Sequence, residues 1–154
     1  MITVRPITAV NWRESLTLGV LPDQQRFIAD HNPIALVGLA KAYVRASGYH
    51  WQPLAFYTEE HIVGFCTLAI KPGSEHVCWL FHFFIDVSFQ RQGLGKSSMQ
   101  ALIEHIKQTY AACQTVHLTV HPDNIPAQRL YQGVGFQTTG EQLFGEPVFA
   151  LKLV

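Results

Sequence analysis

A long apolar strand that leads into a glycine-rich turn and then an amphipathic helix constrains this chain more than any other feature. The predicted strand covers residues 76–86, and Gly93 and Gly95 follow it in a polar turn. Apolar residues then recur at the spacing of one helix face: Met99, Leu102, Ile103, Ile106 and Tyr110. The first N–H groups of a helix have no intrahelical partner and carry the positive end of its dipole. The turn is therefore predicted to bind an anion such as a phosphate, which the glycines admit to the backbone.

This turn has three other interpretations. A P-loop needs a glycine where the chain has Gln90, although Gly95-Lys96-Ser97 matches the second half of that motif. A dinucleotide-binding fingerprint needs a third glycine, which is absent. The third interpretation is a strand-to-helix turn that binds no ligand, since short motifs often match by chance.

Length and composition favour one globular domain, residues 1–154. Apolar residues make up 48% of the chain and charged residues only 14%, a composition that excludes intrinsic disorder. The 11 basic and 11 acidic residues cancel. We therefore expect no nucleic-acid partner, because no basic field is available to attract a phosphate backbone.

Neither the cysteines nor the histidines predict a metal site. Cys66, Cys78 and Cys113 lie in apolar segments and are odd in number, which favours buried free thiols in a reducing compartment. No Cys-x-x-Cys pair occurs, and His117 and His121 would stand ~13 Å apart on a strand. We expect no bound metal.

The termini and apolar runs give no targeting or membrane signal. Residues 1–6 lack the basic and apolar pattern of a signal peptide. The most apolar run, residues 77–87, is shorter than the roughly 20 residues of a membrane span. We expect a cytoplasmic protein with no membrane partner.

Hydrophobic periodicity and turn signals predict the remaining elements. Helices are predicted over residues 10–20, 23–31, 34–46 and 124–134. Strands are predicted over residues 3–6, 53–57, 62–70, 115–120, 136–144 and 147–154. Short polar separators between strands favour antiparallel hairpins. The predicted class is α+β, a mixed sheet covered by helices.

Two motifs in this order resemble those of the GNAT superfamily of acetyl-CoA-dependent N-acetyltransferases. The first is Gln90-x-x-Gly93-x-Gly95, and the second is Asn124-x-x-Ala127-x-x-Leu130-Tyr131-x-x-x-Gly135-Phe136. The resemblance covers nearly the whole chain. It implies the GNAT fold, a mixed and mostly antiparallel sheet of about 6–7 strands, splayed at the cofactor site and accompanied by about 4–5 helices.

A closer likeness is to the bacterial spermine/spermidine (diamine) acetyltransferase-like group. It rests on Trp79-Leu-x-x-Phe83-Phe-Ile-Asp86, on Gln92-Gly-Leu-Gly-Lys96, and on the run from Leu130 to Glu141. Where that group tends to show Asp-Arg, this chain has Phe81-His82. The resemblance therefore implies an amine acceptor and leaves its polyamine character open.

The resemblance also implies where acetyl-CoA binds. Its pantetheine arm would lie along the strand that ends near residues 85–87, and its pyrophosphate on the backbone N–H groups of residues 90–96. The implied cofactor-binding residues are Phe84, Ile85, Val87, Gln90, Arg91, Gln92, Gly93, Leu94, Gly95, Lys96, Ser97, Asn124, Ala127 and Tyr131.

Tyr131 is the implied catalytic residue, because it stands at the motif position of the tyrosine that protonates the departing thiolate. Judged by its helix alone, it would be a core aromatic. Asn124 would likewise be an ordinary N-cap. Tyr131 and Asn124 can each have the role that the motif implies and the structural role that their helix position implies.

The residues alone do not identify the general base or the acceptor contacts. The candidates for the base are His82, Glu75, Asp86 and water, although a histidine in an apolar strand is usually a satisfied interior group. The helix pair that walls the acceptor cleft in GNAT proteins would bring Asp23, Gln24, Gln25, Phe27, Asp30 and Asn32 toward substrate. A solvated helix face explains these six equally well. A polyamine would also need carboxylates, for which the candidates by segment are Asp23, Asp30, Glu75 and Asp86.

The predicted function is transfer of an acetyl group from acetyl-CoA to a primary amine of a small molecule, such as spermidine, by direct attack in a ternary complex. One alternative is a non-catalytic acyl-CoA-binding GNAT-like module. Others are transfer to an amino acid, aminoglycoside or peptide amine, and a P-loop nucleotide hydrolase. A homodimer is expected, because homodimers are frequent among GNAT relatives.

Overall fold

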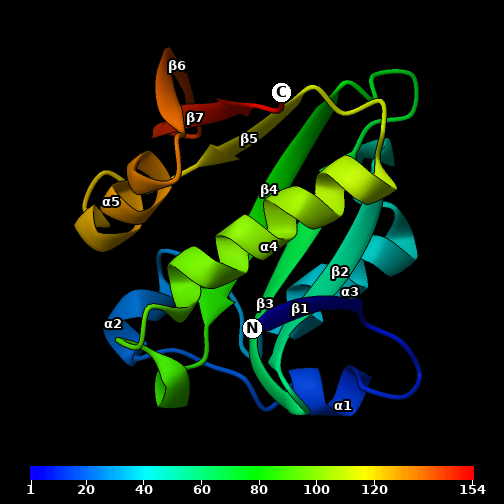
Figure 1. Ribbon diagram of the computed structural model, residues 1–154, viewed down its shortest axis with the longest axis vertical. Coiled ribbons are helices and arrows are strands. Elements are labelled where there is room, and N and C mark those ends of the chain that lie inside the picture. Colours follow the sequence, from blue (N-terminus) through cyan, green and yellow to red (C-terminus); the bar gives the residue numbers. More distant parts are fainter.

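The computed structural model describes all 154 residues, which form a seven-stranded sheet with helices on both faces (Figure 1). The strands are β1 (Ile2–Pro6), β2 (His50–Thr58), β3 (His61–Ile70), β4 (Val77–Ile85), β5 (Thr115–Thr119), β6 (Gln137–Leu143) and β7 (Glu146–Lys152). The helices are α1 (Trp12–Ser15), α2 (Pro22–Gln25), α3 (Ile34–Val44), α4 (Leu94–Thr109) and α5 (Ile125–Gly133), with short 3-10 turns η1 (Ala46–Gly48) and η2 (Val87–Phe89).

The sheet has the order β1-β2-β3-β4-β5-β7-β6. Every neighbouring pair is antiparallel except β4 and β5, which run parallel. The predicted α+β class is therefore confirmed. A P-loop hydrolase is excluded, because that fold needs a largely parallel sheet with crossover helices.

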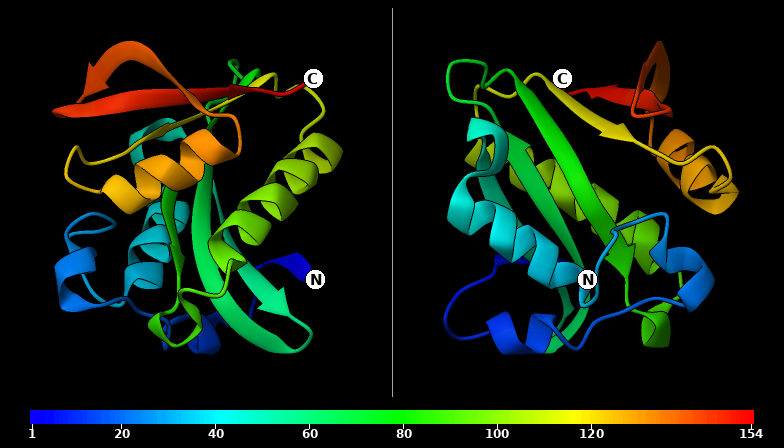
Figure 2. Two further views of the ribbon diagram at one scale, coloured as in Figure 1. Left: turned by 60° about the vertical axis from the view of Figure 1, so that its left-hand side comes forward. Right: turned by 180° about the vertical axis from the view of Figure 1, so that it is seen from behind.

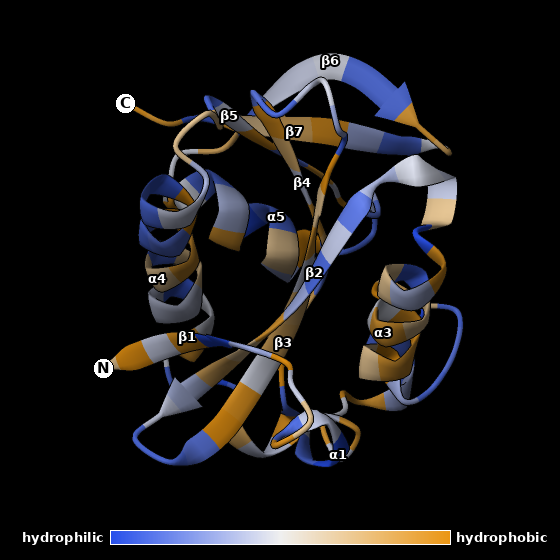
Figure 3. Ribbon diagram, turned by 90° about the vertical axis from the view of Figure 1, so that its right-hand side faces the viewer, coloured by the Kyte–Doolittle hydropathy of each residue, from blue (hydrophilic) through white to orange (hydrophobic).

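Alternation along the central strands gives the sheet two apolar faces, each covered by a helix. Leu54 and Phe56 of β2 join the larger cluster beneath α4, while Ala55 and Tyr57 join the smaller cluster beneath α3. Figures 2 and 3 show the two helices on opposite sides of the sheet, and β6 as a largely hydrophilic outer strand. The predicted free thiols Cys66, Cys78 and Cys113 are all buried. None of the helices is both long and apolar enough to cross a membrane.

The predictions of helices over residues 10–20 and 23–31 were wrong in extent, since α1 and α2 are only four residues each. After α1 the chain leaves helical geometry and reaches the end of β4, where the Gly19 N–H donates to Asp86 Oδ1 at 2.8 Å. After α2 the Gln25 amide donates to the carbonyls of Ala29 and His31, both at 3.0 Å. Short helices are marginal by themselves, so these tertiary and local bonds decide the path.

Gly38 is needed where α3 crosses β3, because a Cβ there would overlap the Thr67 hydroxyl and approach the Phe65 ring to 3.1 Å. We expect Gly38→Ala to lower the free energy of unfolding by about 1–3 kcal/mol, as at other overpacked sites. Urea denaturation measures the loss. Gly133→Ala is the matched control, since no atom lies within 4 Å of a Cβ at that helical glycine. Equal stability of the two variants would contradict the close packing of α3 on β3.

Candidate active site

The two parallel strands separate and leave a cavity between them. β4 and β5 pair only where Val77–Trp79 meets Thr115–His117, and beyond these residues the two strands diverge (Figure 1). The second half of β4 therefore has unpaired backbone groups on this side, which an extended ligand can use as a strand edge. The cavity has a volume of about 830 Å³ and is lined by residues of β4, α3, α4, α5 and the segment around α2.

The N-terminus of α4 opens into this cavity. Gly93 is the N-cap and has φ 77°, and the first intrahelical bond runs from Ser97 N–H to its carbonyl. The N–H groups of Leu94, Gly95 and Lys96 therefore have no intrahelical partner. A Cβ at Gly93 would meet no atom within 4 Å, so the space beside the turn is open. The geometry fits a phosphate held by backbone amides.

Helix α5 contributes Asn124 and Tyr131. The Asn124 side chain caps the helix by accepting a bond from Ala127 N–H at 3.4 Å, so its predicted N-cap role is confirmed. Tyr131 packs against Phe83 and Phe136, with ring centroids 6.4 and 5.9 Å away, and it also lines the cavity. Burial raises the pKa of Tyr131 above its ordinary value. Its hydroxyl therefore keeps a proton that it can donate.

His82 sits at a β-bulge in β4. Thr67 pairs with Phe81 and Phe65 pairs with Phe84, so one residue of β3 faces two of β4, and His82 has φ 56°. Its Nδ1 lies 3.1 Å from the hydroxyl of Thr67, and its ring lines the cavity. Burial, reinforced by the charge of Lys41, lowers the pKa of His82 to about 4. The imidazole is therefore neutral at pH 7 and accessible from the cavity.

Two contacts bridge the segment around α2 to the opposite walls. The amides of Gln24 and Gln90 donate to each other at 3.3 and 3.1 Å, and Gln90 also donates to the Ile85 carbonyl at 3.0 Å. Farther along, the Phe27 ring lies 5.0 Å from the ring of His121. These contacts tie the α2 segment to the turn before α4 and to the loop before α5.

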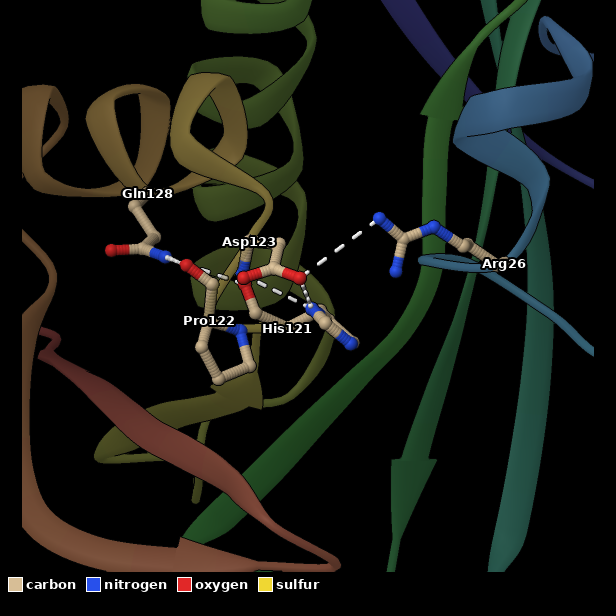
Figure 4. A network of polar contacts seen from close by, with 5 residues as sticks. All are labelled: Arg26, His121, Pro122, Asp123 and Gln128. Atoms are coloured by element: carbon tan, nitrogen blue, oxygen red, sulfur yellow. Dashed lines mark hydrogen bonds and ion pairs between the residues drawn. The ribbon is translucent and has the colours of Figure 1, made fainter.

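Figure 4 shows a third contact, in which the Arg26 guanidinium reaches across to Asp123 at 4.0 Å. The loop it meets is held by Gln128, whose amide donates to the carbonyls of His121 and Pro122 at 3.3 and 2.8 Å. The ion pair is exposed and contributes little stability by itself. With the ring contact of Phe27, it defines one edge of the cavity mouth.

Charged side chains that line the cavity include five that the sequence did not single out as cofactor ligands: Asp23, Arg26, Asp30, Lys41 and Glu146. Arg26, Lys41 and Glu146 were missed altogether. Lys41 is the only charged residue of α3 and lies one helical turn after Val37, a signal that sequence reasoning had available. Glu146 opens β7 beside a turn, and no local pattern marks it.

The structure brings most of the predicted site together. Predicted cofactor residues that line the cavity are Phe84, Ile85, Gln90, Arg91, Gly93, Leu94, Gly95, Asn124, Ala127 and Tyr131. Val87, Gln92, Lys96 and Ser97 do not line it. Of the predicted substrate contacts, Gln24, Phe27 and His82 line the cavity, whereas Asn32 lines a separate small pocket against α3.

Two candidate carboxylates were wrong. Asp86 is buried and its oxygens accept the N–H groups of Gly19 and Ser88 at 2.8 and 3.2 Å, so it is committed to the backbone at the end of β4. Glu75 caps the turn at Gly73 and lies outside the cavity. Neither carboxylate is in position to act as general base or to bind an acceptor.

Comparisons with known proteins agree with this geometry. Residues 21–136 match the model of the acetyltransferase (GNAT) family. The chain is 32% identical over 158 aligned residues to a spermine/spermidine N(1)-acetyltransferase of Bacillus subtilis (strain 168), with 99% of each chain covered. A probable spermine N(1)-acetyltransferase of Bacillus subtilis subsp. natto (strain BEST195) matches with the same identity and coverage.

Solved structures share the fold at lower identity. An aminoglycoside acetyltransferase, AAC(6')-Ib in complex with coenzyme A, superposes with a TM-score of 0.76 at 17% identity, covering 99% of this chain and 95% of the other. An acetyltransferase of the GNAT family from Streptococcus pneumoniae gives a TM-score of 0.73 at 18% identity, with both chains covered completely, 100% each. The predicted GNAT architecture is confirmed by these neighbours.

Proposed function

The chain belongs to the acetyltransferase (GNAT) family and is an acetyl-CoA-dependent N-acetyltransferase, and we propose that its acceptor is a primary amine of a polyamine such as spermidine. The proposal treats residues 1–154 as one acetyltransferase domain. It also includes a homodimer, for which the exposed strand β6 offers an unpaired edge.

The observation that carries the proposal is the cavity between the splayed strands. It joins the open edge of β4, the N-terminus of α4 and the hydroxyl-bearing ring of Tyr131. These are the groups that a thioester donor with a pyrophosphate needs: a strand edge for an amide-rich arm, free N–H groups for phosphate, and a proton donor. Acetyl-CoA supplies the acetyl group in activated form.

We assign the chain's own residues the following roles. Gly93, Leu94 and Gly95 hold the anionic end of the donor at the start of α4. Tyr131 holds a proton on its hydroxyl for the departing sulfur, and its raised pKa keeps that proton bound at neutral pH. Asn124 fixes the first turn of the helix that carries Tyr131.

His82 is our candidate for guiding the acceptor amine. With a pKa of about 4 its imidazole is neutral at pH 7, so it can accept a hydrogen bond from an amine. It binds a proton weakly at this pKa, and a proton taken up there has to pass on to water. Thr67 holds the ring in place through Nδ1.

Support for a polyamine comes from sequence identity and from charge. The two curated relatives named as spermine or spermidine acetyltransferases match along 99% of the chain. Three carboxylates, Asp23, Asp30 and Glu146, line the cavity together with the cations Arg26, Lys41 and Arg91. A polycationic acceptor needs such carboxylates around its tail.

Turnover with spermidine is expected to fall steeply with added salt, more steeply than turnover with a monoamine such as butylamine. The physical reason is that salt screens the attraction between cavity carboxylates and a multiply charged acceptor. Release of free CoA from acetyl-CoA measures the rate, first across polyamines, amino acids, aminoglycosides and peptides. Asp30→Asn should reduce the salt dependence with spermidine.

Glu60→Gln is the control, because Glu60 is an exposed carboxylate that faces Arg5, and neither residue lines the cavity. A salt-insensitive rate, or no rate with any polyamine, would contradict the polyamine proposal and move the acceptor to a neutral or zwitterionic amine. Acetyl-CoA binding without turnover on any acceptor would instead favour the non-catalytic acyl-CoA-binding module.

A further inference from the structure

Lys41 of α3 lines the cavity and places its ammonium group over the rings of Phe81, which also lines the cavity, and of Trp51, which does not. Its Nζ lies 4.9 Å from the centre of the Trp51 ring and 5.3 Å from that of Phe81. Ring faces attract a cation within about 6 Å of their centres. The ammonium takes part in none of the five ion pairs of the structure, so these rings are its main partners.

The β-bulge of β4 puts the Phe81 ring next to the candidate acceptor position. Phe81 immediately precedes His82, and the side chains of both contact residues on the α3 side of the sheet: Phe81 meets Trp51 and Lys41, and His82 meets Thr67. Lys41, Phe81 and His82 line the same cavity. When an acceptor amine lies beside His82, the rest of the acceptor can therefore come close to the Lys41 ammonium.

Lys41 also lies between two cavities. Together with Val37 it lines both the main cavity and a smaller pocket of about 370 Å³ against the outer face of α3. In the main cavity its ammonium lies beside the Phe81 ring. An acceptor tail that extends toward Phe81 therefore approaches this ammonium.

We infer that the Lys41 ammonium occupies the position over the rings of Phe81 and Trp51 where a distal ammonium of the acceptor would otherwise bind. Lys41 is then a specificity-determining residue that disfavours acceptors carrying many positive charges. This inference rests on the proposed function.

The surroundings of Lys41 also indicate that its charge disfavours polycationic acceptors. Burial lowers the pKa of Lys41 below its ordinary value, with only partial compensation from the charge of Asp30. The site therefore holds a single cation at some cost, and a second one nearby adds direct repulsion in a medium that screens less than water. The repulsion should lower kcat/KM more for spermine, with four amines, than for spermidine, and least for a monoamine.

The test compares kcat/KM for spermine, spermidine and butylamine in wild type and Lys41→Met. We expect the ratio of spermine to butylamine to rise at least about fivefold in Lys41→Met, since one like charge is removed and the Phe81 ring is left open. Lys41→Arg keeps the charge and should leave the ratio within about twofold of wild type. Lys71→Met is the matched control, because Lys71 also lies over a ring, 6.0 Å from that of Tyr49, but is outside the cavity.

A second measurement does not depend on turnover. Spermine titrated calorimetrically into the enzyme saturated with free CoA should bind at least about fivefold more tightly to Lys41→Met than to wild type. Lys41→Gln replaces Lys41→Met if the methionine variant does not fold, as judged by thermal unfolding.

The outcomes are separable. An unchanged or lowered spermine-to-butylamine ratio in the folded variant, with an active wild type, overturns the inference and leaves the proposed function intact. A rise of similar size in Lys71→Met also overturns it, because the effect would then be one of net charge. A wild type that acetylates no polyamine overturns the proposed function itself.

Discussion

Tyr131→Phe is expected to slow the chemical step about 10²-fold while acetyl-CoA affinity changes by less than about threefold. The substitution removes only the hydroxyl, so the ring should keep its contacts with Phe83 and Phe136. The chemical step slows because the departing sulfur no longer receives a proton from this hydroxyl. Because burial raises the pKa of Tyr131, the wild-type hydroxyl remains protonated, and able to donate, throughout the usual assay range.

Single-turnover quench experiments are the proper measurement, since product release can limit steady-state turnover and hide a slower chemical step. The defect should shrink as pH rises above about 8.5, the reference pKa of a free thiol, because the thiolate can then leave without a proton. Tyr110→Phe is the control: this tyrosine is also partly buried, with a pKa raised by burial, but it lies outside the cavity. A Tyr131→Phe rate equal to wild type at pH 7 would make Tyr131 a packing residue.

Gly93→Val should weaken acetyl-CoA binding by at least ~2 kcal/mol, or roughly thirtyfold. The residue caps α4 with φ 77°, a conformation that costs a branched residue about 1–2 kcal/mol. Relief of that strain turns the amides of Leu94 and Gly95 away from the cavity, and the valine side chain itself enters the open space beside them. Both effects remove charge-assisted contacts to the pyrophosphate.

Gly73→Val separates the two effects. Gly73 has φ 88° and, like Gly93, no atom within 4 Å of an added Cβ, but it lies in the hairpin turn between β3 and β4, outside the cavity. We expect a similar loss of stability in both variants and a loss of acetyl-CoA affinity only in Gly93→Val. Calorimetric titration of the folded proteins decides the point. Unchanged affinity in Gly93→Val would mean that the phosphates bind elsewhere.

The strands and long helices were predictable because each carries its own periodic signal. The pattern from Met99 to Ile106 specifies α4, and the nearly continuous apolar run over residues 62–70 specifies β3. The segments 10–20 and 23–31 were not predictable in the same way. Their local sequences permit longer helices. The bond from Gly19 to Asp86, made only in the folded chain, and the local bond from Gln25 to Ala29 hold the chain in other conformations after α1 and α2.

The donor half of the site was also largely predictable. The contacts proposed for it would come from backbone groups at the start of α4 and from α5, and they were predicted from the resemblance of two short motifs to those of the GNAT family. Ten of the fourteen predicted cofactor residues line the cavity: Phe84, Ile85, Gln90, Arg91, Gly93, Leu94, Gly95, Asn124, Ala127 and Tyr131. The four that do not line it are Val87, Gln92, Lys96 and Ser97.

The acceptor half depends on the tertiary structure. Lys41, His82 and Glu146 come from a helix, a bulged strand and a turn that are far apart in the chain, and no local rule links them. Asp86 looked available from its position after β4, yet folding commits both its oxygens to backbone N–H groups. Side-chain contacts between distant segments follow from packing, which local periodicity does not encode.

The sequence by itself determined the order of the elements and the glycine-rich turn before α4, because each rests on interactions between residues close in the chain. The role proposed for Tyr131 came from the resemblance of its motif to the GNAT family. Only the tertiary structure decided where β4 parts from β5, which carboxylates face the cavity, and that Lys41 lies over Trp51 and Phe81. The physical reason is that helix dipoles, caps and turns act over a few residues. The charge and shape of a cavity are instead sums over side chains that meet only when the sheet and its helices have packed.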